Sequence, residues 1–165
     1  MTVVADVTSQ VNKLLIQAGM RPRGIQSEAM NKGLLEGKSI MVSSPTGSGK
    51  TLVGEMAVLR AVTCSRKGLF LVPLRALAVQ IFRTMRERYE HLGISIGLST
   101  GDFQNSGDDL AEYDVIVTTY ERADSLLRSR CSWLYEVGTV VIDEVQTLSE
   151  TSRGARLESF IIRIK

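Results

Sequence analysis

Residues 44–51 read SPTGSGKT, a run of small and hydroxylated side chains that ends in a lysine and a threonine. The run matches the phosphate-loop pattern G-x-x-x-x-G-K-[ST], except that serine takes the first glycine place. Small residues let the backbone wrap around a phosphate chain, and a helix that starts there adds its positive dipole end. Lys50 would reach the β- and γ-phosphates, and the Thr51 hydroxyl would help to hold Mg²⁺. We therefore expect a nucleotide site formed by Thr46, Gly47, Ser48, Gly49, Lys50 and Thr51.

Two adjacent carboxylates, Asp143 and Glu144, end the apolar part of VVIDEVQ at residues 140–146. Alone, such a pair often does no more than cap the next helix. Downstream of a phosphate loop, such a pair can also supply the carboxylates that a nucleotide-bound Mg²⁺ needs opposite the loop. Asp143 would hold Mg²⁺ through water, and Glu144 would orient and deprotonate the attacking water. The sequence thus predicts nucleotide hydrolysis, with Lys50, Asp143 and Glu144 as the catalytic residues.

The elements that must position these residues alternate along the chain. Short, nearly continuous apolar runs lie at 39–43, 68–72, 93–99, 114–119 and 139–144. Helix-patterned segments lie at 8–18, 25–36, 51–63, 75–90 and 120–129. Such alternation predicts one α/β lobe with a buried parallel sheet, whose strand carboxyl ends bring the two motifs together. The acidic, glycine-containing segment at 101–114 is the one expected flexible excursion.

Composition sets bounds on the function without identifying it. The chain has 165 residues, 44% of them apolar, and 20 basic against 18 acidic side chains, which permits a nucleic-acid partner but does not imply one. No run approaches the roughly 18 apolar residues of a membrane span, and the start of the chain lacks a signal-peptide pattern. Cys64 and Cys131 have no metal-like spacing and are expected to be reduced, and His91 is expected to be a surface residue at a helix end. We expect a cytoplasmic protein that does not contact membranes.

Several classes of nucleotide-binding protein do not fit. A GTPase should carry Asn-Lys-x-Asp, and neither NKLL (12–15) nor NKGL (31–34) supplies the aspartate. LSTGDFQ (98–104) is not the signature of an ABC-type ATPase, and no short segment offers the arginine-rich lid of a small-molecule kinase.

The chain instead resembles the superfamily-two helicases, and among them the Ski-two-like family. SSPTGSGKT is similar to their motif I and DEVQ to their motif II. Further segments in matching order are GIQSEAM (24–30), VPLRALAVQ (72–80), LSTGD (98–102), VTTYERADSLLR (117–128) and RGARLE (153–158). The archaeal DNA-repair and fork-remodelling helicases look like the nearest branch. The resemblance implies a RecA-like P-loop NTPase domain with helices on both sheet faces.

The resemblance also implies roles for single residues. Gln26 would read the adenine edge of ATP, since its amide can both donate and accept; without the resemblance it would be interpreted as an ordinary surface residue of a helix. Gln146 stands where many relatives have histidine, and it is expected to affect coupling more than ATP binding. In place of the usual adenine-stacking aromatic the chain has RPRG, so Arg21 or Arg23 could stack instead, or the grip on adenine is looser. A row of residues at strand ends would hold a single nucleic-acid strand by its backbone: Arg75, Thr100, Gly101, Thr118, Thr119 and Arg122.

The expected domain covers residues 1–165 and represents most of the first motor lobe of a longer helicase. No Ser-Ala-Thr motif follows DEVQ, and the second RecA-like lobe, with the arginines that would complete the ATP site, is expected in the same parent chain. The expected cofactors are ATP and Mg²⁺, and the expected partner is single-stranded or forked DNA rather than RNA. An RNA helicase of the same family, a nucleic-acid-binding ATPase clamp without unwinding, and an ATPase acting on a small molecule stay open. The basic segment 74–93 is interpreted as a sheet-packed helix with a solvated face, not as a site.

Overall fold

A parallel sheet forms the centre of the domain in the computed structural model, which describes residues 2–45, 47–101, 107–146, 158 and 161. Within these residues the strand order is β2-β3-β1-β4, and every neighbouring pair runs parallel. The strands are β1 (Lys67–Val72), β2 (Ile96–Ser99), β3 (Val115–Thr119) and β4 (Val137–Ile142). Because they all point the same way, their carboxyl ends share one edge of the sheet.

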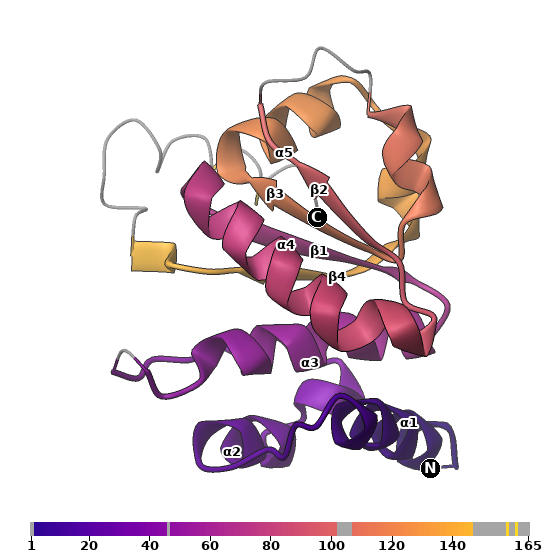
Figure 1. Cartoon of the computed structure of the whole chain (residues 1–165), viewed down its shortest axis with the longest axis vertical. Coiled ribbons are helices and arrows are strands. Elements are labelled where there is room, and N and C mark those ends of the chain that lie inside the picture. Colours follow the sequence, from indigo (N-terminus) through magenta and orange to yellow (C-terminus); the bar gives the residue numbers. More distant parts are fainter. Residues whose placement is uncertain (1, 46, 102–106, 147–157, 159–160, 162–165) are drawn as a thin grey trace.

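Helices cover both faces of this sheet, as expected. Phe70 and Val72 pack into the core shared with α1, α3 and α4, whereas Leu69 and Leu71 pack into the core shared with α5. Figure 1 shows α4 crossing one face of the sheet, with α1 and α2 forming an outer pair beyond α3. The helices are α1 (Thr2–Gln17), α2 (Ile25–Asn31), α3 (Lys50–Thr63), α4 (Arg75–Tyr89) and α5 (Tyr120–Arg128). None of the helices in the described part of the chain is long and apolar enough to cross a membrane.

The continuous apolar runs are explained by the position of each strand in the sheet. All residues of β3, and all of β1 after Lys67, are buried, because both strands have neighbours on each side and helices on each face. β4 pairs only with β1 among the described residues and is correspondingly half-exposed. The helix that carries the phosphate loop packs tightly on this sheet: a Cβ at Gly54 of α3 would lie 2.8 Å from the Phe70 ring and 2.9 Å from Val141.

The prediction of a strand at residues 39–43 is wrong. This segment forms no ladder with any described strand. Ile40 and Val42 pack partly against the core, while Met41 between them is 85% exposed. The apolar side chains of the segment therefore pack on one side only, beside α3. A strand also needs a partner backbone, which residue type alone does not specify.

Other differences from expectation are smaller. The helix expected at 25–36 ends at Asn31, because Gly33 takes a φ of 97° and opens a separate 3₁₀ turn, η1 (Leu34–Glu36). The segment 101–114 is in part well packed: η3 (Asp108–Glu112) follows the buried Gly107, whose carbonyl accepts a hydrogen bond of 2.8 Å from the indole of Trp133. Trp133 belongs to η4 (Ser132–Glu136). Residues 107–112 thus form a defined turn, the flexibility expected of the segment stays a prediction, and residues 102–106 lie outside the described part.

The expectations for the histidine and for the packing of the basic segment are confirmed. His91 is exposed in η2 (Glu90–Leu92) after α4. Cys64 is exposed and Cys131 is buried, and their reduced state stays a prediction. On α4 the side chains that face the sheet are buried and apolar, and most of the arginines are exposed. Arg88 is the exception, since it turns inward to an acidic partner.

Candidate nucleotide site

The phosphate loop and the paired carboxylates line the same cavity. Its volume is about 570 Å³, and its walls include Lys50 and Thr51 at the start of α3 together with Asp143, Glu144 and Gln146 just after β4. These two groups are more than ninety residues apart in sequence, and the parallel sheet brings them together at its carboxyl edge. The arrangement can therefore present a lysine, a hydroxyl and two carboxylates to a single phosphate chain.

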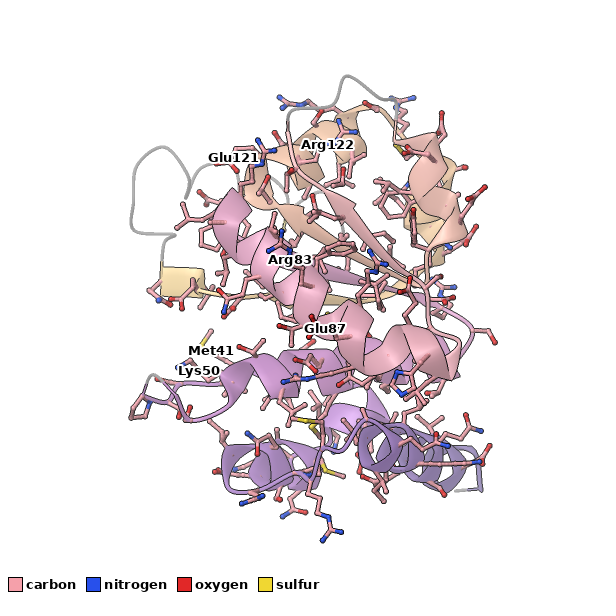
Figure 2. All side chains as sticks on the ribbon, in the orientation of Figure 1. Met41, Lys50, Arg83, Glu87, Glu121 and Arg122 are labelled. Carbon is pink, nitrogen blue, oxygen red and sulfur yellow. The ribbon has the colours of Figure 1, made fainter. Side chains whose placement is uncertain are left out.

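The phosphate loop holds its lysine in place through two backbone carbonyl groups. Gly47 and Gly49 have φ of 79° and 86°, a region that only glycine enters readily, and Gly49 is the N-cap of α3. The Lys50 ammonium donates to the carbonyl oxygens of Ser44 at 2.5 Å and Pro45 at 3.0 Å. Figure 2 shows Lys50 at the loop end of α3. Thr46, expected to belong to this loop, lies outside the described residues.

One polar atom of the loop indicates a missing partner. The hydroxyl of Ser48 is buried and has no hydrogen-bond partner among the described residues. A buried hydroxyl without a partner costs about 1–3 kcal/mol, so native structures rarely keep one without reason. A phosphate oxygen in the loop would supply an acceptor, and the residues present therefore fit a nucleotide.

The two carboxylates differ in environment. Burial raises the pKa of Asp143; the neighbouring Glu144 charge adds to this, while the Glu144 N–H, which donates to Asp143 Oδ1 at 3.0 Å, and the Lys50 charge oppose it. Glu144 has a φ of 56°, unusual for a residue other than glycine, and its carboxylate accepts a hydrogen bond from the Gln146 amide. Strained backbone of this kind collects at functional sites. A cation beside Asp143 would favour its charged form.

The donor set suits magnesium rather than a protein-enclosed metal. Thr51 is exposed, and its hydroxyl and the Asp143 carboxylate supply oxygen ligands from two walls of one cavity. Within the described residues there is no cluster of three or more histidine, cysteine, aspartate or glutamate side chains that could enclose a metal ion. Mg²⁺ needs no such cluster, because it keeps several waters and binds through one or two protein oxygens plus phosphates.

A second cavity of about 790 Å³ adjoins the other side of the loop. Gly47, Ser48, Gly49 and Thr51 line it, so it continues directly from the phosphate site. Its remaining polar wall carries both arginines of the segment before α2, with Gln26 and two charged residues from the helices: Arg21, Arg23, Gln26, Glu55 and Arg88. A nucleoside attached to phosphates in the loop would have room here.

Gln26 is not the surface residue that its helix pattern alone indicates. It is 7% exposed, and its side-chain amide donates to the carbonyl oxygens of Ser48 at 3.2 Å and Gly49 at 3.0 Å. Its side-chain oxygen accepts from the Arg23 N–H at 2.8 Å. The nitrogen of this amide thus supports the phosphate loop and its oxygen holds the backbone before α2, and reading a base would require at least one of these bonds to be exchanged.

A buried charge on α3 forms the floor of this cavity. Glu55 is 1% exposed and accepts hydrogen bonds of 2.6 Å from both the Arg88 guanidinium and the Tyr89 hydroxyl of α4. This group was not identified as functional from the sequence. A signal was nevertheless present, because one glutamate within the apolar run LVGEMAVL must have a partner if the run is buried.

The residues expected to hold nucleic acid lie along the rim of the sheet in strand order. Thr100 and Gly101 follow β2, Thr119 ends β3 with Arg122 in the first turn of α5, and Arg75 begins α4 after β1. Arg75 and Gly101 are exposed, whereas the threonine side chains are buried. Thr119 has a structural role of its own, since its hydroxyl accepts the Arg122 N–H at 3.4 Å and so caps α5.

The comparisons with known proteins agree with this geometry. The sequence profile of the DEAD/DEAH box helicases matches residues 23–165. The chain is 37% identical over 98% of its length to the "ATP-dependent DNA helicase Hel308" of Methanococcus vannielii, and 40% identical over 96% to the protein of that name from Pyrococcus abyssi. It spans 22% of the length of each of these relatives.

A solved structure supports the fold separately. The chain superimposes on the DUF1998 helicase MrfA with a TM-score of 0.77 at 24% identity, covering 95% of this chain and 26% of that one. Likeness at this identity bears on the fold alone. Together with the parallel sheet, it confirms the RecA-like architecture expected from the sequence.

Proposed function

We propose that this chain, which belongs to the DEAD/DEAH box helicases, is the ATP-binding motor lobe of an ATP-dependent DNA helicase. The observation that carries the proposal is the shared cavity, in which Lys50 and Thr51 face the same space as Asp143 and Glu144. The names of the relatives favour DNA over RNA as the substrate.

Binding of ATP would exchange bonds within the phosphate loop. The Lys50 ammonium would leave the Ser44 and Pro45 carbonyls for the β- and γ-phosphates, and Ser48 would gain an acceptor for its buried hydroxyl. Thr51 and Asp143 would hold Mg²⁺, which would neutralise the charge that develops on the phosphates. The nucleoside would occupy the second cavity, with Gln26 turning one end of its amide to the adenine edge.

Hydrolysis would depend on Glu144. Its carboxylate would orient the attacking water and accept its proton, a role that needs the charged form. The hydrogen bond from Gln146 holds this carboxylate at the cavity wall. We propose Gln146 as the residue through which the state of the site is passed to the rest of the motor.

The rim residues would hold one strand of DNA by its sugar–phosphate backbone. Arg75 would contribute charge and the exposed Gly101 would allow close approach, while the buried threonines would shape the surface or offer backbone groups. Single-stranded or forked DNA is the substrate we propose. DNA repair or fork remodelling in the cytoplasm is the setting that we propose for it.

A second RecA-like lobe of the parent chain would complete the ATP site. An arginine supplied from outside a site of this type is worth on the order of 10³-fold or more in rate. The segment of 165 residues alone should therefore bind nucleotide weakly and hydrolyse little.

The test uses the full-length protein that contains this chain. Its ATP turnover would be measured alone and with single-stranded DNA or RNA, beside Glu144→Gln and the surface control Glu112→Gln. We expect strong stimulation by DNA, lost in Glu144→Gln and kept in the control. Equal rates with and without every nucleic acid would overturn the proposal. Stimulation by RNA alone would favour the RNA helicase alternative, and stimulation without strand displacement would favour the clamp.

A further inference from the structure

Tyr120 joins two parts of the site that are separated in the sheet. It is the first residue of α5, it follows β3 directly, and its side chain is wholly buried. Its hydroxyl donates a hydrogen bond to the backbone carbonyl of Asp143, the residue after β4. Since β1 lies between β3 and β4, the tyrosine ring spans the end of the central strand, packed in the cluster that contains Leu71.

The backbone of Tyr120 lies among the rim residues. Thr119 precedes it and caps α5 by accepting the Arg122 N–H. The Arg122 guanidinium in turn donates to the Ser99 hydroxyl at 3.1 Å, which connects the first turn of α5 to the end of β2. Figure 2 shows Arg122 on α5, away from Lys50 at the phosphate loop. A strand bound along this rim would press on the turn that holds Tyr120.

The far end of the contact lies at the catalytic peptide. The Asp143 carbonyl belongs to the peptide bond between Asp143 and Glu144, so its direction governs the orientation of both carboxylates. On its other side this segment is held by the Asp143 N–H, which donates to the Leu71 carbonyl at 2.9 Å. Glu144 carries the unusual φ of 56°, a conformation that persists only where surrounding contacts enforce it.

We infer that Tyr120 is a positioning residue that couples nucleic acid at the rim to the orientation of Asp143 and Glu144. The inference rests on the proposed function. Movement of the first turn of α5 moves the phenol, the phenol moves the Asp143–Glu144 peptide, and the carboxylate of Glu144 turns toward or away from the attacking water. In this role Tyr120 acts through the Asp143–Glu144 peptide and not on a reacting atom.

The test is Tyr120→Phe in the full-length protein, which removes the hydroxyl and keeps the buried ring. The readout is the ratio of DNA-stimulated to basal kcat, measured with KM for ATP and with DNA affinity. We expect this ratio to fall at least fivefold while DNA affinity stays within twofold. The matched control is Tyr135→Phe, since Tyr135 is 84% exposed on the 3₁₀ turn η4 before β4, and its ratio should equal that of the wild type.

The outcomes separate the inference from the function on which it rests. A purely structural role for the hydroxyl would lower basal and stimulated rates by the same factor and leave the ratio unchanged, which would overturn the inference. A ratio within twofold of wild type at unchanged rates would overturn it as well. A wild-type ratio of one with every nucleic acid would overturn the proposed function itself, and the inference with it.

Discussion

Glu55 and Arg88, one on the helix after the phosphate loop and the other on the helix after β1, form an ion pair of 2.6 Å at the floor of the cavity beside the loop. The carboxylate is 1% exposed and the guanidinium side chain 30% exposed. The Tyr89 hydroxyl donates to the second oxygen of the Glu55 carboxylate, which therefore has two hydrogen-bond donors. This contact ties α3, and thus the phosphate loop, to α4, and α4 begins at Arg75 on the rim.

Glu55→Ala should lower the free energy of unfolding by about 2 kcal/mol. The substitution removes two short hydrogen bonds to a charged group and leaves the buried Tyr89 hydroxyl without this acceptor, whereas Arg88 can turn to water. The control is Glu90→Ala, whose ion pair with Arg86 is exposed and should be worth less than about 0.5 kcal/mol. Urea unfolding of both variants checks this, and equal losses would contradict it.

Tyr89 should make stability fall in alkaline solution. Burial raises the pKa of its phenol well above the usual value of about 10, and the Glu55 charge adds to this. In the unfolded chain the phenol ionises near pH 10, whereas in the folded chain it keeps its proton. The unfolded state therefore binds fewer protons above pH 10, and stability should decline there by up to about 1.4 kcal/mol per pH unit.

The variant Tyr89→Phe isolates this effect from the ionisation of other groups. It should be less stable than wild type at pH 8, because it loses the bond to Glu55, and its stability should fall less steeply between pH 10 and 12. Unfolding midpoints in urea at several pH values provide the comparison. Parallel curves for the two proteins would show that Tyr89 titrates normally.

The two glycines of the phosphate loop should respond differently to alanine. Both have positive φ, so each substitution should cost about 1 kcal/mol of backbone strain. At Gly49 the new Cβ would also collide with the Gln26 amide, whereas at Gly47 it would meet no described atom. Gly49→Ala should therefore lower the melting temperature more than Gly47→Ala.

A double substitution tests whether the Gln26 contact explains that difference. In a Gln26→Ala background the amide is absent, so Gly49→Ala and Gly47→Ala should lower the melting temperature by about the same amount. An excess cost at Gly49 that survives in this background would mean that the collision is not its cause.

The two cysteines should react at very different rates. Cys64 is exposed, whereas Cys131 is 3% exposed, and burial, with the Asp108 charge, raises the pKa of its thiol. Both access and thiolate fraction thus protect Cys131. Titration with a chromogenic disulfide at pH 8 should give one fast thiol, absent in Cys64→Ser, and two in denaturant. Two fast thiols in the native protein would refute the burial of Cys131.

Arg75→Gln should weaken DNA binding by the full-length protein about equally for all sequences and lower the slope of log affinity against log salt by about 1. This follows if the arginine contacts phosphate, because each neutralised phosphate releases counterions. Arg83→Gln is the matched control, since Arg83 is exposed on the outer side of the same helix (Figure 2). An equal change of slope in both variants would place DNA elsewhere.

The chemistry that we propose for the site could be predicted from the sequence because it depends on local spacing. The glycines, lysine and threonine of residues 47–51 must be adjacent to wrap a phosphate, and Asp143 and Glu144 must follow an apolar strand to reach the sheet edge. The order of strands and helices was equally readable, since continuous apolar runs report burial on both faces. These features determined the fold class and the location of the site.

The tertiary structure decided which distant groups meet. Segment 39–43 has the composition of a strand, but it forms no ladder with any described strand. Gln26 could have been any polar residue of a surface helix until packing set its amide against the phosphate loop. Glu55 bonds to Arg88, which is 33 positions away in the chain. Tyr120 bonds to the carbonyl of Asp143, which is 23 positions away. Periodicity encodes the local backbone and the face that is buried, whereas the partner of a buried polar group depends on how the layers pack.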